Sequence, residues 1–153
     1  MILLTLMACE LTPDDLCAGK GPISLELGPR DGDGFEPFQD GDLAELIEPP
    51  QGGLGVAWRG RSLGLVGNNL VDLEMSTTID DEVVGEFTAE DWLIYCQEDG
   101  ASLMWGTATP IDEELYPDSS VLDGVEAVLA VVATDVEGEV AEAQVSVVIE
   151  VRE

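Results

Sequence analysis

Histidine is absent from this chain of 153 residues, and lysine and arginine together number only five against 33 acidic residues. A formal net charge of −28 argues against nucleic-acid binding and against electrostatic attraction to anionic membranes, because both depend on clustered Lys and Arg. The missing histidine removes the commonest general base and the commonest transition-metal ligand. We therefore expect a protein that is not an enzyme.

Long apolar runs are also lacking, since none approaches the ~20 residues of a membrane-spanning helix. Even so, 45% of the residues are hydrophobic and the mean hydropathy is +0.14, which is enough to bury the core of one domain. The acidic surplus has two interpretations. One is adaptation to a salty medium, and the other is an extracellular acidic protein of ordinary salt tolerance.

The first residues are apolar and end in Leu6-Met7-Ala8-Cys9, which resembles the lipobox of bacterial lipoproteins. The resemblance implies cleavage before Cys9, a diacylglycerol on its thiol, and an exported protein anchored at the outer membrane, the cell surface or the periplasmic side of a membrane. Contact with the membrane is then expected only through that lipid. The usual positively charged n-region is missing, so we expect a start further upstream or a fragment. The alternative is an ordinary apolar N-terminus with a chance cysteine.

On this interpretation, residues 1–8 are the remnant of a signal segment, 9–22 a polar tether and 23–153 the folded domain. Assigning Cys9 to lipid leaves Cys17 and Cys96, which we expect to be bonded in an oxidising compartment. Two buried free thiols are the alternative.

Short alternating segments separated by turn residues predict an all-β protein of about eight to ten strands. Expected strands include 23–27, 43–48, 56–58, 62–66, 70–75, 82–87 and 92–96. The acidic pair Asp80-Asp81 predicts a turn between two of them. The clearest signal is a hairpin of 125–133 with 140–151, although a helix is a rival for the alanine-containing first segment.

Two resemblances follow from these segments. Val131-Val-Ala-Thr-Asp135, Gly138 and the alternating run 143–151 resemble the closing hairpin of bacterial immunoglobulin-like modules of the polycystic-kidney-disease and hyalin-repeat types. This implies an Ig-like antiparallel β-sandwich. Phe38-Gln-Asp-Gly-Asp42 and Pro50-Gln-Gly-Gly53 resemble uncharacterised acidic lipoproteins of myxobacterial type, which implies a surface lipoprotein without an established activity. Those proteins often carry His where this chain has Gly55.

No cofactor is expected, and calcium is the alternative at four aspartates. Asp31, Asp33, Asp40 and Asp42 supply carboxylate oxygens of the kind that Ca²⁺ prefers, although their spacing does not match an EF-hand loop. The expected structure is therefore a solvated acidic turn that binds no metal, in which Asp and Gly are favoured by their backbone preferences.

Arginines and tryptophans suggest a ligand site. Arg59 and Arg61 lie two residues apart, hence on one face of an extended segment, where they either clamp a carboxylate or sugar acid or pair with neighbouring acids. The three Trp residues, at positions 58, 92 and 105, form either a sugar-stacking platform or part of the core.

The sequence therefore predicts a lipid-anchored surface module that interacts with an unknown protein or glycan. The rivals are a small calcium- or carbohydrate-binding module and an accessory subunit of a surface complex.

Overall fold

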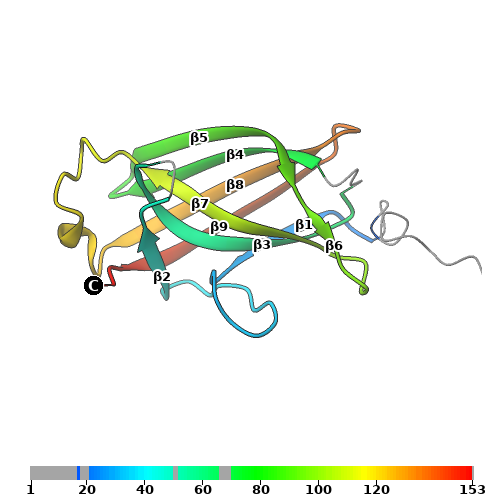
Figure 1. The fold of residues 1–153 in the computed structure, drawn as a ribbon, viewed down its shortest axis with the longest axis horizontal. Helices are drawn as coiled ribbons and strands as arrows, with labels where there is room; N and C mark the ends of the chain where they lie inside the picture. Colours follow the sequence, from blue (N-terminus) through cyan, green and yellow to red (C-terminus); the bar gives the residue numbers. More distant parts are fainter. Residues whose placement is uncertain (1–16, 18–20, 50–51, 66–69, 153) are drawn as a thin grey trace, which may run out of the picture.

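A computed structural model describes residues 17, 21–49, 52–65 and 70–152, and these form a sandwich of two β-sheets (Figure 1). Nine strands make up the two layers: β1 (Ser24–Gly28), β2 (Asp42–Ile47), β3 (Leu54–Leu63), β4 (Leu70–Ile79), β5 (Glu82–Leu93), β6 (Tyr95–Cys96), β7 (Ser102–Ile111), β8 (Glu126–Asp135) and β9 (Val140–Glu150). The short 3₁₀ helix η1 (Ser119–Leu122) lies between β7 and β8. The expected all-β sandwich is confirmed.

Sheet A, nearer the viewer in Figure 1, has β3 at its centre, with β7 and then β6 on one side and both β1 and β2 on the other. Sheet B lies behind it in the order β5-β4-β8-β9-β2. All neighbours are antiparallel except β2 and β9, which run parallel. The sandwich is therefore mixed at this single pairing rather than purely antiparallel.

The chain passes from one sheet to the other at both lateral margins. At one margin, β2 pairs with β9 through residues 42–45 and with β3 through Leu46 and Ile47. At the other margin, β5 ends at Leu93 in sheet B, and Tyr95 already pairs with Leu103 in sheet A. Each crossing joins the two layers covalently and leaves less free strand edge for pairing with another chain.

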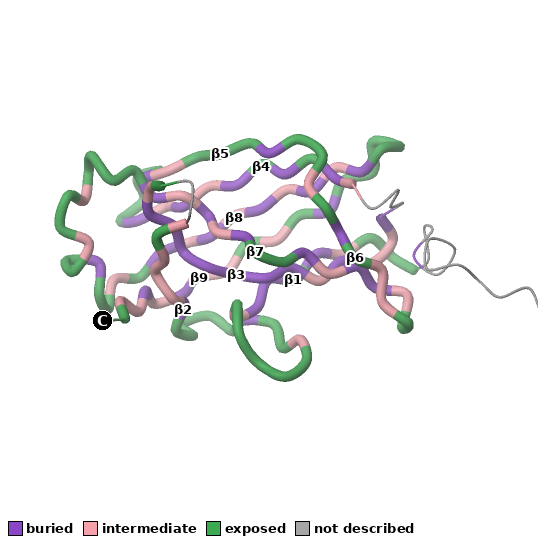
Figure 2. Tube along the Cα trace, in the orientation of Figure 1, coloured by how far each residue is buried: buried purple, intermediate pink, exposed green. Residues whose placement is uncertain are grey.

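Alternating burial defines the core, which Figure 2 shows as buried segments along the strands of both sheets. Along β8, Leu129 and Val131 are fully buried and alternate with half-buried residues, so the period is two and the segment is a strand rather than a helix. β8 pairs with β9 from Thr134–Val140 to Glu126–Val148, which confirms the expected hairpin. Opposite them, Trp58 of β3 is also fully buried.

The turn at Asp80 and Asp81 is confirmed as well. Both residues have positive φ, 50° and 65°, and they join Ile79 of β4 directly to Glu82 of β5. Two successive left-handed residues give a turn whose twist matches that of the flanking strands, and Asp tolerates this conformation better than most side chains.

Two strand predictions are wrong. Segment 92–96, expected as one strand, is divided between β5, which ends at Leu93, and β6 in the other sheet. The second concerns the surroundings of Gly60. Segment 56–58 and residues 62 and 63, expected in two short strands around Gly60, belong to the single strand β3, which ends at Leu63. Gly64 and Leu65 lie beyond this strand, and residue 66 lies outside the described residues. Gly60 faces inward, where an added Cβ would lie 3.0 Å from the ring of Trp58 and 3.1 Å from the sulfur of Met104. The glycine therefore makes room for two large core side chains and does not mark a break.

The disulfide between Cys17 and Cys96 is confirmed, with their Cα atoms 5.7 Å apart. Cys17 is buried, and its Sγ lies 3.1 Å from the carbonyl oxygen of Ala101. The bond ties the chain ahead of β1 to the edge strand β6. Cys9, the lipobox and most of the predicted tether lie outside the described residues. Within the described part, no helix has the length and apolar character needed to cross a membrane.

Candidate functional site

Arg59 lies in the middle of β3, on the outer face of sheet A, and is only 4% exposed. Its Nη1 donates a hydrogen bond to the carbonyl oxygen of Gly32 at 3.3 Å, and its Nη2 donates to that of Gly34. The guanidinium carbon lies over two rings, 5.7 Å from the centroid of Phe35 and 5.4 Å from that of Trp105. These contacts fasten the 29–41 loop to the sheet.

This arginine has no carboxylate partner among the residues that the structure describes, although the chain carries 33 acids. Its Nε, moreover, has no hydrogen-bond partner in the described part. Cation–π contacts and carbonyl oxygens therefore take the place of an ion pair, and the desolvation of the surroundings strengthens these contacts.

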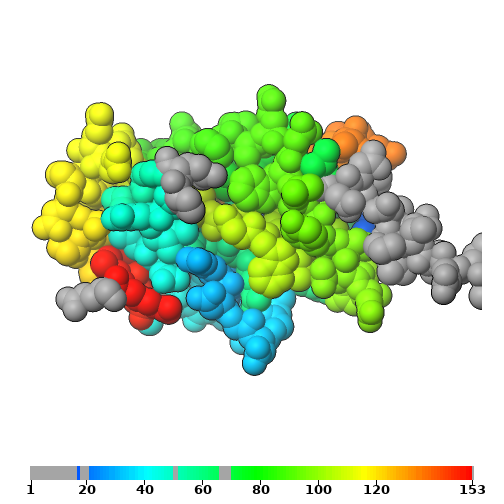
Figure 3. Space-filling model, in the orientation of Figure 1, coloured from blue at the N-terminus to red at the C-terminus, as the bar shows by residue number. Residues whose placement is uncertain are grey.

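Two glycines make this arrangement possible. Gly28 pairs with Arg59 in the sheet, and a Cβ at Gly28 would lie 2.2 Å from the carbonyl oxygen of Glu36, so the loop packs directly on the backbone of β1. In β7, the register shifts between Met104 and Thr107, and Gly106 adopts a φ of +70°. This bulge leaves Trp105 on the outer face beside Arg59. In Figure 3, blue atoms of the loop border the yellow-green atoms of β7.

Arg61 lies on the same outer face, as expected from its spacing to Arg59, but its environment differs. Its guanidinium pairs with Asp99 at 3.0 Å and with Glu26 at 3.7 Å. Hydrogen bonds from the Ala101 N–H and then from Arg61 hold the pKa of Asp99 below its usual value. Arg61 thus pairs with neighbouring acids, whereas Arg59 has no acid partner in the described part of the chain. A ligand role for either residue stays a prediction.

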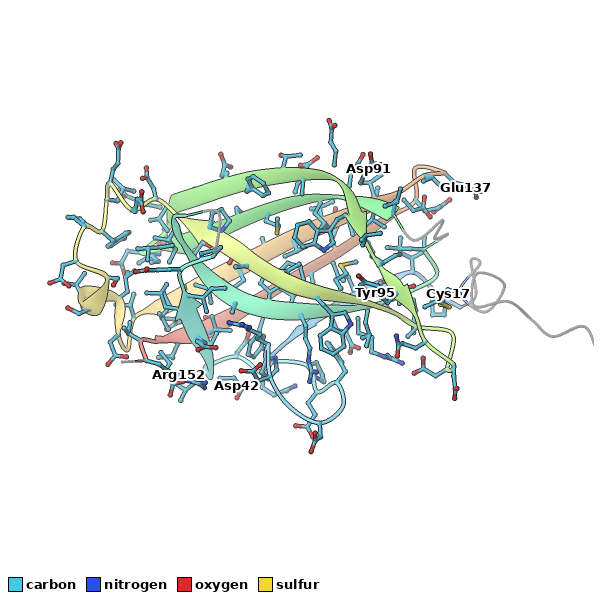
Figure 4. All side chains as sticks on the ribbon, in the orientation of Figure 1. Cys17, Asp42, Asp91, Tyr95, Glu137 and Arg152 are labelled. Carbon is cyan, nitrogen blue, oxygen red and sulfur yellow. A yellow bond between two sulfur atoms is a disulfide. The ribbon has the colours of Figure 1, made fainter. Side chains whose placement is uncertain are left out.

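The outer face of sheet A also presents exposed apolar side chains. Tyr95 is 50% exposed and Trp105 is 45% exposed. Tyr95 is directly opposite Leu103, and Trp105 is two residues further along β7, so all three point to the same side. We call Tyr95, Leu103 and Trp105 the aromatic platform. Figure 4 labels Tyr95 close to Cys17, at the end of the molecule that carries the disulfide.

The three tryptophans do not form a common surface, so of the two alternatives the three-Trp platform is wrong, and the core placement holds for Trp58 and Trp92. Trp58 is fully buried, Trp92 packs against the core from β5, and Trp105 alone of the three belongs to the exposed face. Sequence reasoning missed Tyr95 and Phe35. The apolar run Trp92–Cys96 indicated a strand, but nothing in it showed that the chain changes sheets at Ile94 and turns the Tyr95 side chain outward.

The four aspartates considered as calcium ligands lie along the 29–41 loop and at the start of β2. Asp40 accepts a hydrogen bond from the Ser146 N–H at 3.2 Å, and Asp42 accepts one from the Gln39 N–H at 2.8 Å. Asp31 and Asp33 are exposed. Within residues 21–49, 52–65 and 70–152 together with Cys17, no three His, Cys, Asp or Glu side chains are grouped so as to hold a metal ion. Calcium binding stays an alternative to the expected absence of a cofactor.

A shallow pocket of about 220 Å³ lies at the opposite end of β3 from Arg61. Its lining comes from the ends of β2 and β3 and from the loop before η1: Glu48, Leu54, Glu113, Tyr116, Pro117 and Ser119. Two glutamates and no cation line it, so it offers little to an anionic ligand.

Comparison with known proteins adds no family to this description. No protein-family model matches the chain, and no curated protein is significantly similar to it.

Proposed function

We propose that this protein is a lipid-anchored module of the bacterial cell surface that binds a partner through the outer face of sheet A and has no catalytic activity. The observation that carries the proposal is the aromatic platform, on which Tyr95 and Trp105 remain half exposed. Exposed aromatic side chains on a rigid sheet are typical of recognition surfaces.

Two features support export and anchoring. The disulfide between Cys17 and Cys96 is of the kind that persists in oxidising compartments outside the cytosol. Cys9 follows Leu6-Met7-Ala8, which resembles a lipobox, and stands eight residues before Cys17. Acyl chains on Cys9 would hold the sandwich close to the membrane at the end where the aromatic platform lies.

The anchoring is tested by metabolic labelling with an alkyne fatty acid. The chain is expressed in a bacterial host with a positively charged n-region added before Met1, and Cys9→Ser is compared with the unsubstituted chain. We expect label on the wild type and none on Cys9→Ser. The matched control is Cys96→Ser, which loses a cysteine outside the lipobox and keeps the label. An unlabelled wild type, or a labelled Cys9→Ser, would contradict the proposal.

Surface exposure needs a separate measurement. Protease added to intact cells should cleave the wild-type protein, and antibody raised against the sandwich should bind the same cells. Protection from both reagents until the outer membrane is permeabilised would instead show an inward-facing protein and would refute the surface location.

A further inference from the structure

The contacts of Trp105 hold one side of its indole ring in place and leave the other side accessible to a ligand. The Arg59 guanidinium lies over the Trp105 ring at 5.4 Å, and Arg59 is itself buried, while the residue Trp105 remains 45% exposed. Arg59 in turn is held by the carbonyl oxygens of Gly32 and Gly34. The inner side of the indole is thus fastened to the protein and the outer side meets solvent. A ring fixed in this way loses little conformational freedom when a ligand packs on it.

The second aromatic side chain extends this surface. Tyr95 and Trp105 are diagonal neighbours on adjacent strands, because Tyr95 is opposite Leu103 and Trp105 is two residues beyond. Diagonal neighbours in a sheet are about 7–8 Å apart, so one extended ligand can contact both rings. The ion-paired group of Arg61 and Asp99 lies next to them, since Arg61 is opposite Leu103 on the other side of β7.

Charge restricts the chemical class of that ligand. A cation stacked on the outer side of Trp105 would be repelled by the guanidinium behind the ring. An anion would approach a chain with a net charge of −28. A second copy of this chain would meet the same repulsion. What remains is a neutral ligand with an apolar side for the rings and hydroxyl groups for the carboxylate and guanidinium beside them.

We propose that the aromatic platform binds a neutral polysaccharide, with sugar rings stacked on Trp105 and Tyr95 and sugar hydroxyls hydrogen-bonded to Asp99 and Arg61. This inference rests on the proposed function, because it names the ligand class of the same face. Asp99 accepts hydrogen bonds from sugar hydroxyls, and Arg61 donates hydrogen bonds to them. Together they match a sugar hydroxyl, which is both a donor and an acceptor.

Affinity electrophoresis tests the inference with defined probes. The full chain carrying Cys9→Ser, which is free of lipid, is run through native gels containing hydroxyethylcellulose, glucomannan or laminarin, with alginate as the charged comparison. At least one neutral polysaccharide should retard it, and alginate should not. Trp105→Ala and Tyr95→Ala should each weaken binding at least about tenfold, because each removes a stacking surface.

The matched control is Phe87→Ala, which removes an aromatic side chain that is 53% exposed on β5, outside the platform. It should bind as the parent does, and Trp105→Phe should recover part of the affinity lost in Trp105→Ala. Melting temperatures of all variants show whether a loss of binding reflects unfolding. Since Tyr95 makes no ring contact with Arg59, Tyr95→Ala tests the site even if Trp105→Ala proves unstable.

Three results would overturn the inference: no retardation of the Cys9→Ser chain by any of the three neutral probes, retardation by alginate alone, or equal binding by a folded Tyr95→Ala variant. These failures are distinguishable from a failure of the proposed anchoring, because this experiment uses unlipidated protein and the labelling experiment uses no polysaccharide. If the wild type is labelled but binds no neutral polysaccharide, the proposed lipid anchoring stands and the inferred ligand class is wrong. A protein would then be the partner to test.

Discussion

Reduction of the Cys17–Cys96 disulfide is expected to lower the free energy of unfolding by about 4.5 kcal/mol. The two cysteines are 79 positions apart, so the bond closes a loop that contains β1 to β5. For a loop of about 80 residues, the chain-entropy relation gives a loss of roughly 15 cal/mol/K in the unfolded state, or about 4.5 kcal/mol at 25 °C. In a chain of this size, each kcal/mol corresponds to about 2–4 °C, so the melting temperature should fall by about 9–18 °C.

The assay is thermal unfolding followed by circular dichroism on the Cys9→Ser chain, with and without a thiol-free reductant. Reduced protein alkylated while unfolded serves to check that the bond was cleaved. The double variant Cys17→Ser/Cys96→Ser should match the reduced protein, apart from a further loss of packing at the buried position 17. A shift below about 2 °C on full reduction would refute the reasoning, because it would show that the bond does not restrict the unfolded chain.

Four further predictions concern charge, turns and packing. Raising NaCl to ~1 M should raise the melting temperature, because it shortens the Debye length to about 3 Å and screens repulsion among 33 acids; a flat or falling curve would show that the acids are already compensated. Asp135→Ala should cost about 1–3 kcal/mol in urea unfolding, since its carboxylate accepts hydrogen bonds from two backbone N–H groups of the β8–β9 turn, and Asp135→Asn, which keeps an acceptor, should cost less. Gly85→Ala should cost about 1–3 kcal/mol or more, since its Cβ would lie 2.2 Å from the carbonyl oxygen of Pro110; stability equal to wild type would contradict the close approach of β5 and β7. The pKa of Asp99 is lowered from its ordinary value of 3.8, chiefly by the Ala101 N–H, so its stabilising contribution is complete above pH 3.8 and is lost as the pH falls through the lower folded-state pKa. Asp99→Asn should remove that part of the acid dependence, and an unchanged acid limb of the stability curve would count against it.

Local patterns in the sequence were sufficient for the features that depend on neighbours along the chain. The β8–β9 hairpin follows from alternating Val residues around Asp135 and Gly138, because a half-buried strand requires a period of two. The turn at Asp80-Asp81 follows from residues that accept left-handed backbone. The disulfide followed from the number of cysteines, because assigning Cys9 to the lipid leaves only Cys17 and Cys96 to form a bond.

Features that depend on distant segments were not predictable in this way. β2 pairs with β3 in one sheet and with β9 in the other. This arrangement requires β9, about 100 residues later in the chain, to lie beside Asp42. Gly60 suggested a break because its inward partner Met104 is not visible from local sequence. The contacts of Arg59 combine a loop, a strand and a bulge, and no periodicity in the sequence connects Phe35, Arg59 and Trp105.

The disulfide also determines how mechanical force passes through the molecule. A pull applied at residue 17 reaches β6 through one covalent bond, since Cys17 is joined directly to Cys96. Residues 18–95, which include β1 to β5, lie outside the load path between residue 17 and the C-terminus. Tyr95 is the residue next to the point where the load enters the sheet. The part of a pull between residue 17 and a ligand that acts on Tyr95 would cross only the peptide unit between Tyr95 and Cys96 before it reaches the disulfide.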